Sequence, residues 1–490
     1  MHTEKTVALS ATARAVAARV GSLRDFLEFL GEQGQCVHWP DPVLPEPDIR
    51  NISVAAGNDA ATGPAVVFDK IRGYPGKRIA INVHGSFGNL ALLLGYPKTT
   101  PIRDLFHEII RRWGSDKPLL ERIAPEKAPV NENRLEKNIN LYSLLPLYRI
   151  NACDGGFYIA KACVVSRDPL EPDNFGKQNV GIYRIQVMGP DTFTLLSIPA
   201  HDMGRQMLMA EQHNKPLKVS IMIGNHPAMA MFAATPVGYD ESEFAYASQM
   251  MGAPLRLTTA VNGTDILADS EMVIEGELLP NQREVEGPFG EFPGSYSGVR
   301  KVPLFRVTGV SHRNDPIFEN IYIGKGWTEH DTLIGLNTSA PIYAQLKKDF
   351  PEVVAVNALY QHGLTGIIAV LDPDDGTVQY ASAGHPPLLL GGLTGITQLG
   401  PTGPLLGPID ATWETRELSL TRGGVLVAFS DGLIEARDVE GEPFGVKRIA
   451  AIVERTQLGG PDAVADACLD AVQAHQLTRE DDLTLVVLAR

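Results

Sequence analysis

Between about residues 138 and 320, the sequence is made of many short β-type segments separated by Gly, Pro, Asn and Asp. Short runs rich in β-branched and aromatic residues, each closed by turn-forming residues, are typical of strands with tight connections. This pattern predicts a β-barrel with inserted helices for the middle of the chain. It also marks off the segments on either side, which have different patterns.

The segment in front of the barrel has the mixed pattern of a small α/β domain. Ser22 begins a helix with a capping-box-like start, and the apolar residues on one face of that helix are Leu23, Phe26, Leu27 and Leu30. Strand-like and helical runs follow at 65–68, 78–83, near Leu90 and at 102–113. We therefore predict an α/β domain over residues 1–115, followed by a charged, proline-containing connector.

Behind the barrel the pattern changes again. A helical stretch at 342–350 leads to an apolar run at 365–370. Gly-rich turns then join short strands, and two helices and a last strand follow, at 378–381, 387–390, 417–420, 424–429, 446–456, 461–475 and 483–488. The whole chain is therefore predicted to be of the α+β class.

Charge and cysteine content argue against several classes of protein. The net charge is -15 without a long basic run, so we expect neither nucleic acid nor a membrane surface as a partner. The four cysteines are scattered, which argues against a structural zinc site or a disulfide framework. No apolar run approaches the roughly 18 residues of a membrane span, and the first residues lack the apolar core of a signal peptide. We expect a cytoplasmic protein.

Two carboxylates flank a bent segment near residue 290. Glu286 and Glu291 are separated by Gly-Pro-Phe-Gly, so the backbone between them is bent and held. Such a turn can aim both acids at one point, and in a partly dry pocket one acid can donate a proton while the other stays ionised. Taken alone, the segment also fits a Gly-Pro loop with two solvated glutamates.

A loop that runs into a strand supplies two further polar side chains. Asn179 offers an amide oxygen, and Arg184 offers a fork of donors suited to a carboxylate or a phosphate. Strict alternation would put the two on opposite faces of a strand. Gly181 lies between them, at a position where a bulge could bring them together.

Two more candidate ligands lie downstream. His201 follows a Pro-Ala pair, and Glu243 ends an acidic segment after a proline-bent turn. With Asn179 they form a mixed oxygen and nitrogen set, suited to a manganese or magnesium ion with open positions for a phosphate. Each residue alone also fits a structural role, because a lone His is commonly a packing residue and Glu243 suits the first turn of a helix over 244–251.

Together these motifs resemble the UbiD-like decarboxylases, and most closely their phenolic-acid branch, the hydroxybenzoate and vanillate enzymes. The resemblance covers about residues 20–364. It rests on five blocks, namely Asn140-Leu-Tyr-Ser-Leu-Leu-Pro146, Asp154-Gly-Gly-Phe-Tyr158, Asp173-Asn-Phe-Gly-Lys-Gln-Asn-Val-Gly-Ile-Tyr-Arg184, Glu275-Gly-Glu277 and Glu286-Gly-Pro-Phe-Gly-Glu-Phe292. The activity implied is a carboxy-lyase that decarboxylates an aromatic, phenolic acid.

The family resemblance implies a prenylated flavin mononucleotide (prenylated FMN), held through its phosphate by Mn²⁺ or Mg²⁺ in a split β-barrel. By the same resemblance, the metal is held by Asn179, His201 and Glu243, and the flavin site also includes Ile182, Tyr183 and Arg184. K⁺ is a candidate further ion. A flavin prenyltransferase is the implied supplier of the cofactor, and a homo-oligomer is the implied assembly.

The cofactor and residues implied by the resemblance suit the chemistry of decarboxylation. Decarboxylation of an arene leaves negative charge on a ring carbon, so the reaction needs an electron sink that side chains do not offer and a modified flavin does. The resemblance implies that Arg184 pairs with Glu286 and orients the substrate carboxylate. It also implies that Glu291 is the acid that protonates the carbon after carbon dioxide leaves.

After about residue 364 the decarboxylase pattern stops. Residues 365–490 resemble the C-terminal half of PPM-type serine/threonine phosphatases of the SpoIIE and RsbU kind, on the blocks Tyr380-Ala-Ser-Ala-Gly-His-Pro-Pro387, Phe429-Ser-Asp-Gly-Leu-Ile-Glu-Ala436, Gly441-Glu-Pro-Phe-Gly445 and Asp481-Asp-Leu-Thr-Leu485. This resemblance implies that Asp431 and Asp481 are ligands of a second metal. The same residues also fit turns at strand ends, and the phosphatases' earlier acidic motif is not recognisable.

We therefore predict a fusion of two truncated domains, natural or an artefact. Its four parts are an N-terminal α/β domain (1–115), a split β-barrel flavin-binding domain (116–320), the start of a decarboxylase C-terminal domain (321–364) and a partial PPM-phosphatase-like antiparallel β-sheet with helices (365–490). Three functions stay open: a decarboxylase impaired by the missing region, a phosphatase or signalling remnant, and an inactive fusion. Each truncated domain would leave core surface or sheet edges exposed that the missing segments normally cover. We therefore expect reduced stability or aggregation.

Overall fold

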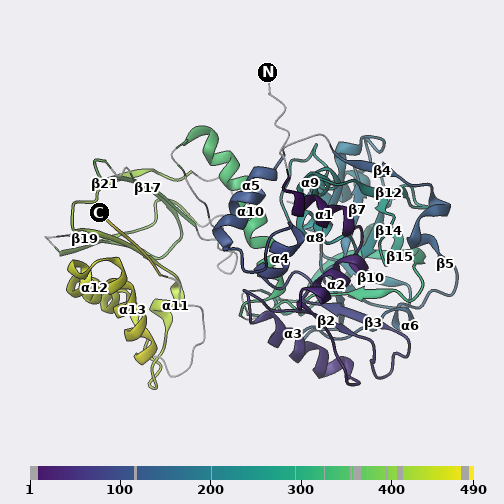
Figure 1. Cartoon of the computed structure of the whole chain (residues 1–490), viewed down its shortest axis with the longest axis horizontal. Coiled ribbons are helices and arrows are strands. Elements are labelled where there is room, and N and C mark those ends of the chain that lie inside the picture. The colour runs from purple at the N-terminus through teal and green to yellow at the C-terminus, as the bar shows by residue number, and fades with distance from the viewer. Residues whose placement is uncertain are drawn as a thin grey trace. The chain divides into compact units, whose positions relative to one another are not determined.

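The computed structural model of the chain describes residues 9–114, 118–199, 201–292, 294–324, 326–351, 353, 356, 366–371, 374–392, 395–404, 412–475 and 485–490 (Figure 1). By its internal contacts the chain divides into two compact units, Met1–Ala358 and Leu359–Arg490. Each unit has its own buried apolar residues. The mixture of helices and strands confirms the predicted α+β class.

The first unit begins with a four-stranded sheet and the helices around it. The strand order is β1 (Cys36–His38), β2 (Ala65–Phe68), β3 (Arg78–Ile81) and β16 (Ile317–Glu319). The helices are α1 (Ala11–Arg19), α2 (Leu23–Glu32), α3 (Arg50–Gly57), α4 (Phe87–Leu93) and α5 (Ile102–Arg112). β16 comes from the far end of the predicted barrel segment and pairs in parallel with β3, so the two parts of this unit share a sheet.

The helix α2 shows how local sequence sets these elements. The Ser22 side chain accepts the N–H of Asp25, which satisfies a donor that the first turn of a helix leaves open. The predicted apolar face is buried, namely Leu23, Phe26, Leu27 and Leu30. Burial of a large apolar side chain stabilises a fold by about 1.5–3 kcal/mol, so this face holds the helix on the domain.

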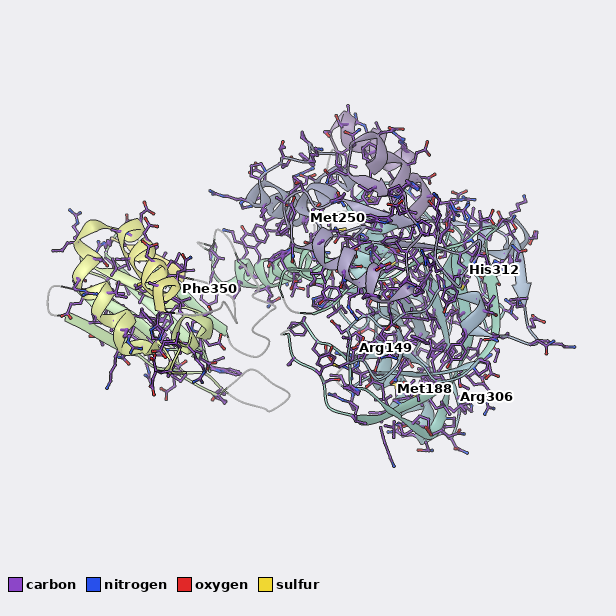
Figure 2. The ribbon with its side chains drawn as sticks, turned by 90° about the horizontal axis from the view of Figure 1, so that it is seen from below. Arg149, Met188, Met250, Arg306, His312 and Phe350 are labelled. Carbon is purple, nitrogen blue, oxygen red and sulfur yellow. The ribbon has the colours of Figure 1, made fainter. Side chains whose placement is uncertain are left out.

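The middle of the first unit is a nine-stranded antiparallel sheet. Its main path is β6-β9-β10-β15-β14-β11-β7-β8, and β5 pairs with β15. The bounds are β5 (Asn133–Leu135), β6 (Phe157–Ile159), β7 (Cys163–Arg167), β8 (Gln178–Ile182), β9 (Ile185–Val187), β10 (Thr192–Leu195), β11 (Leu217–Ile223), β14 (Met272–Glu286) and β15 (Arg300–His312). Arg306 and His312, labelled in Figure 2, both lie on β15. Glu286 is the last residue of β14, so this sheet carries the first of the two predicted acids.

Four more helices and a small sheet also belong to the first unit. The small sheet has the order β13 (Asp265–Leu267), β12 (Leu255–Thr259) and β4 (Leu120–Arg122). The helices are α6 (Leu141–Leu144), α7 (Asp202–Gln212), α8 (Pro227–Ala233) and α9 (Glu243–Met251). The ring of Trp113 lies 5.5 Å from that of Phe232 and 5.3 Å from that of Tyr246, so the N-terminal part packs against α8 and α9.

The helix α10 (Glu329–Asp349) is longer than predicted. The sequence pattern places a helix only from residue 342, because Pro341 is a residue at which helices usually begin or end. The structure continues through Pro341 and starts the helix at a capping box formed by Thr328 and Asp331. The residues in front of the proline therefore belong to the helix.

Within its described residues, the second unit contains two antiparallel sheets, three α-helices and a short 3-10 helix (Gln457–Gly459). One sheet has the order β17-β18-β21 and the other β20-β19-β22-β23. The bounds are β17 (Gly366–Leu371), β18 (Thr377–Ala383), β19 (Leu388–Gly392), β20 (Gly395–Leu399), β21 (Arg416–Ser419), β22 (Val425–Phe429), β23 (Leu485–Ala489), α11 (Asp431–Glu435), α12 (Gly445–Thr456) and α13 (Pro461–His475). The predicted elements agree with these to within two residues, while β20 and α11 are additional. Ile449 and Val464 join the two long helices to a core with β22.

Among the described residues, no helix has the length and apolar character that crossing a membrane requires. All four cysteines are free, and Cys163 and Cys468 are buried. The finer boundaries predicted inside each unit stay predictions.

Candidate active site

The strand that carries Asn179 ends before Arg184, and a second strand begins after it. β8 ends at Ile182 and β9 begins at Ile185, so Tyr183 and Arg184 lie in the break. The pairing of β8 with β7 runs without a shift through Gly181, so the bulge suggested for that glycine does not form. The glycine is needed for another reason: a Cβ there would lie 2.6 Å from the ring of Tyr183, which folds back over the strand.

Arg184 joins the two predicted acids. Its Nη2 donates to Oε2 of Glu286 at 2.6 Å, and its Nη1 donates to Oε1 of Glu291. Glu286 is fully buried, whereas the Glu291 side chain is 30% exposed. The Nε of Arg184 is buried and has no hydrogen-bond partner within the described part of the chain. The structure thus brings the three predicted catalytic residues together and leaves one buried donor for a ligand.

Further contacts hold this group in place. The ring of Phe289 lies 5.3 Å from the guanidinium of Arg184, within the range of a cation–π interaction. The Tyr158 hydroxyl donates to Oε1 of Glu286 at 3.0 Å and lies 3.1 Å from Oε1 of Gln186. Sequence reasoning missed Tyr158 and Gln186 as site residues. For Tyr158 the available signal was its place at the end of one of the family blocks.

The three predicted metal ligands lie around Tyr183. Glu243, the first residue of α9, is buried, and its Oε2 accepts the N–H of Val180 at 2.9 Å. Asn179 is buried on β8, with its side-chain amide 3.4 Å from the Tyr183 hydroxyl. His201 directly precedes α7, and its ring lies 5.9 Å from that of Tyr183. Their role as ligands stays a prediction.

The surroundings of Glu243 suit a bound cation. Burial raises the pKa of Glu243 to about 8, because a carboxylate removed from water loses stability in its charged form. Within the described residues Glu243 forms no ion pair, and nearby Asp202 adds a second negative charge. A divalent ion with oxygen and nitrogen ligands would supply the missing positive charge. The predicted set of Asn179, His201 and Glu243 therefore fits such a metal.

A different cluster in this unit has metal-like spacing but is closed by a lysine. His84, Glu319 and Glu329 place one ligand atom each within 4.8 Å of the others. The buried ammonium of Lys161 contacts Glu319 at 2.6 Å and also bonds to Glu329. Although burial alone would raise the pKa of Glu329, Lys161 and His84 hold it at about 2. The lysine takes the place of a metal ion, and the cluster is a buried salt-bridge network.

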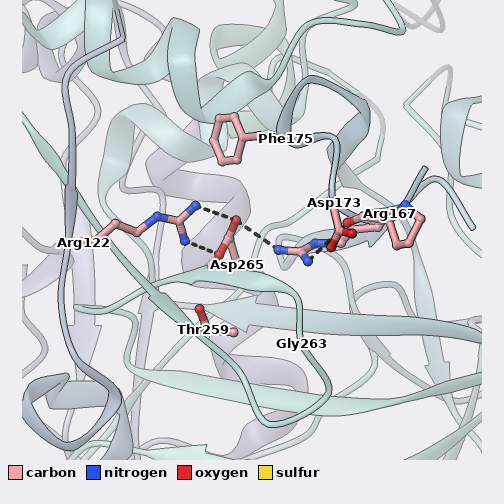
Figure 3. A pocket seen from close by; sticks show the side chains of 8 residues that line it. Arg122, Arg167, Asp173, Phe175, Thr259, Gly263 and Asp265 are labelled. Carbon is pink, nitrogen blue, oxygen red and sulfur yellow. Dashed lines mark hydrogen bonds and ion pairs between the residues drawn. The ribbon is translucent and has the colours of Figure 1, made fainter.

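A pocket of about 260 Å³ lies beside the start of β8, between two arginines (Figure 3). Arg122 and Arg167 both bond to the buried Asp265. The side-chain amide of Gln178, the first residue of β8, donates to the same carboxylate at 3.2 Å. The bonds to Asp265 hold the start of β8, the strand that carries Asn179. Because the charged groups are paired with one another, the pocket adds no reactive group to the site.

The second predicted metal site is described only in part. Asp431 begins α11, directly after β22. Asp481 lies outside the described residues. A metal bound by these two aspartates therefore stays a prediction.

Comparison with known families assigns both parts of the chain. Residues 27–109 match the N-terminal domain, and residues 121–326 the Rift-related domain, of 3-octaprenyl-4-hydroxybenzoate carboxy-lyase, UbiD. Residues 337–490 match stage II sporulation protein E, SpoIIE, so this second match begins inside α10.

Phenolic acid decarboxylases are among the relatives. That of Sedimentibacter hydroxybenzoicus is 47% identical over 350 residues, which cover 71% of this chain and 73% of the relative. That of Bacillus subtilis is 45% identical over 348 residues, with the same two shares.

Solved structures agree with these matches. The vanillic acid decarboxylase of Sedimentibacter hydroxybenzoicus in its closed form is 48% identical, with a TM-score of 0.68, over 70% of this chain and 72% of that chain. An evolved dimeric form of the UbiD-class enzyme HmfF from Pelotomaculum thermopropionicum, in complex with prFMN, is 29% identical, with a TM-score of 0.61, over 68% of this chain and 74% of that one. The predicted resemblance is confirmed: the chain belongs to the UbiD family of carboxy-lyases, with a SpoIIE domain fused behind its UbiD part.

Proposed function

We propose that the chain decarboxylates an aromatic carboxylic acid of the phenolic class without net oxidation. The observation that carries the proposal is the placement of Arg184 between the buried Glu286 and the partly exposed Glu291. A guanidinium held this way keeps a fixed direction. Its Nε, which has no partner among the described residues, is a donor for a substrate or cofactor oxygen.

Prenylated FMN, when bound, supplies the electron sink that charge on a ring carbon requires. The residues that would hold it are those of the predicted site, with Asn179, His201 and Glu243 on the metal, and Ile182, Tyr183 and Arg184 at the flavin. The buried carboxylate of Glu243, which has no cationic partner among the described residues, supports the metal, as Mn²⁺ or Mg²⁺.

The two acids have different tasks in this proposal. Arg184 binds and orients the substrate carboxylate, while Glu286, fully buried against it, keeps the guanidinium in position. Glu291 gives its proton to the ring carbon that has lost carbon dioxide. Because its side chain is 30% exposed, Glu291 regains a proton from solvent.

The phenolic substrate class rests on the relatives, which are phenolic acid decarboxylases at 47% and 45% identity. A flavin prenyltransferase would supply the cofactor. K⁺ is proposed as a further ion and a homo-oligomer as the assembly, the second supported by the dimeric form of the HmfF relative.

A second candidate function rests on the SpoIIE match. In that case the C-terminal part is a metal-dependent serine/threonine phosphatase or a signalling remnant, with Asp431 and Asp481 on the metal. Hydrolysis of a phosphoserine peptide that depends on Mn²⁺ would support it. If the chain is an inactive fusion, neither decarboxylation nor phosphatase activity will be found.

The experiment that tests the proposal is co-expression of the full chain with a flavin prenyltransferase. After size exclusion, the soluble peak is assayed for visible flavin absorbance, manganese content and release of carbon dioxide from a panel of phenolic acids. We expect flavin and metal in near-equal amount, and turnover of at least one acid. Flavin-loaded protein that releases carbon dioxide from none of the acids would contradict the proposed function, and protein without flavin would contradict the proposed site.

A further inference from the structure

Two segments far apart in the chain are joined directly behind the candidate catalytic group. The Asp154 carboxylate accepts the N–H of Gly290 at 2.8 Å with Oδ1, and the N–H of Asn151 at 2.7 Å with Oδ2. The N–H of Gly155 donates to the carbonyl of Pro288 at 2.7 Å. The loop that leads from Glu286 to Glu291 is therefore bonded along its length to the segment 151–155.

Glycine at two positions makes this close approach possible. A Cβ on Gly155 would lie 2.2 Å from the carbonyl oxygen of Gly287. A Cβ on Gly290 would lie 2.2 Å from the side-chain amide of Asn151. Both distances are far shorter than a non-bonded contact, so any larger residue would force the two segments apart.

Tyr158 makes a second connection, to the buried acid itself. Its side chain is fully buried on β6, and its hydroxyl lies between Oε1 of Glu286, at 3.0 Å, and Oε1 of Gln186, at 3.1 Å. The Gln186 oxygen already accepts the N–H of Gly287 at 3.0 Å. A hydroxyl has one proton to donate, and a carboxylate is the stronger acceptor. The hydroxyl proton therefore points to Glu286.

The hydroxyl stays a donor throughout the working pH range. Burial, and after it the negative charge of Glu286, raise the pKa of Tyr158 well above its usual value. The charged groups that face the hydroxyl are Glu286, Arg184 and Asp154. The ring of Phe289, 4.5 Å from the Tyr158 ring, packs against Arg184 as well. Tyr158 therefore cannot turn away from Glu286 without disturbing the arginine.

We propose that Tyr158 and Asp154 are positioning residues of this site, Tyr158 by fixing the carboxylate of Glu286 against Arg184, and Asp154 by holding Gly290 and thereby placing Glu291. The inference rests on the proposed function for its catalytic meaning. It explains the division of tasks: Glu286 has both oxygens engaged, one by the guanidinium and one by the hydroxyl, and cannot move. Within the described residues, the side chain of Glu291 bonds to Arg184 alone and is 30% exposed, so it is held less tightly than Glu286.

The first test is Tyr158→Phe in the flavin-loaded full chain. Removal of the hydroxyl leaves Oε1 of Glu286 buried without a donor, so the carboxylate is held less firmly against Arg184. We expect kcat to fall about tenfold, since a hydrogen bond to a charged group contributes about that factor. We also expect KM and the flavin content to stay unchanged. The matched control is Tyr74→Phe, whose hydroxyl donates to a backbone carbonyl outside the site.

The second test is Asp154→Asn. The amide is a weaker acceptor for the N–H of Gly290, so we expect a loss of kcat without a matching change in KM. The matched control is Asp59→Asn, in which a carboxylate also accepts two backbone N–H groups, from Ala61 and Thr62, away from the site. Equal losses in both aspartate variants would overturn the placing role of Asp154.

A thermal-unfolding cycle separates this inference from the proposed function, because it needs no turnover. Tyr158→Phe should lower the unfolding midpoint of the wild-type chain at least twice as much as it lowers that of Glu286→Gln, in which the charged acceptor is gone. If Glu286→Gln does not fold, Glu286→Asp, whose side chain is too short to reach the hydroxyl, completes the cycle. Equal shifts in both backgrounds would overturn the inference whether or not the wild type releases carbon dioxide.

Discussion

The buried Glu243 leads to a prediction about stability in the absence of metal. Its pKa in the fold is about 8, against a usual value of 4.5. Because the folded pKa is raised, the folded chain keeps a proton that the unfolded chain releases. The stability is therefore fully present below pH 4.5 and is lost as pH rises towards 8. At about 1.4 kcal/mol per pH unit, the loss amounts to about 3 kcal/mol at pH 7 and about 5 kcal/mol above pH 8.

The perturbation is Glu243→Gln, which removes the titrating group and keeps an oxygen that can accept the N–H of Val180. In chelator-treated protein we expect this variant to be more stable than the wild type at pH 7, by about 3 kcal/mol, and within about 1 kcal/mol of the wild type at pH 5. Mn²⁺ should raise the unfolding midpoint of the wild type and leave the variant unchanged. The measurement is urea unfolding followed by fluorescence at several pH values.

The control is Glu284→Gln, an exposed glutamate on the same long strand as Glu286. It should change neither the pH dependence nor the response to Mn²⁺. A Glu243→Gln chain with the same pH dependence as the wild type would refute the reasoning that an uncompensated buried carboxylate destabilises the metal-free fold. Equal stabilisation of both chains by Mn²⁺ would show that the metal binds elsewhere.

Three further outcomes follow from the structure. Glu291→Gln should lower kcat by about a hundredfold or more, because general-acid catalysis supplies that factor, while flavin absorbance survives; loss of the flavin would show that Glu291 is structural. Lys161→Met leaves Glu319 and Glu329 buried without their cation and should lower the free energy of unfolding of the first unit by about 3–5 kcal/mol. A change below about 1 kcal/mol, which is typical of surface ion pairs, would contradict the role of this cluster as a buried salt-bridge network. Phe429→Ala removes a buried ring from the second core, and calorimetry should show one transition shifted and another unchanged; a single transition that shifts as a whole would show that the two units do not unfold separately.

The predictable part of the site is local in sequence. Glu286 and Glu291 are five residues apart, and the glycines and proline between them indicate a bend without any knowledge of the fold. The first-turn position of Glu243 in α9 is equally local, because a short acidic segment precedes an apolar helical run. The pairing of Arg184 with Glu286 came from the family resemblance, and the structure adds the bond of Arg184 to Glu291.

The missed part depends on contacts that no local pattern encodes. The hydrogen bond of Tyr158 to Glu286 joins residues 128 positions apart, and that of Gly290 to Asp154 joins residues 136 apart. In the strand order, β6 and β14 are separated by β9, β10 and β15, and Asp154 and Gly290 lie in loops, so neither contact can be read from neighbouring strands. The bulge considered at Gly181 does not form, and the closeness of the Tyr183 ring to Gly181 depends on the strand break, which the sequence does not reveal.

Glu329 has a consequence for how such a fusion can arise. It is the first residue of α10, and its carboxylate accepts the N–H groups of Asn82 and His84, at 2.9 and 2.8 Å, besides its bond to Lys161. These bonds hold the first turn of α10 within the first unit. The SpoIIE match begins eight residues further on, at residue 337. Recombination within this helix can exchange all residues downstream and leave the bonds of Glu329 intact. The helix α10 is therefore a position at which a different C-terminal domain can be joined to the UbiD part.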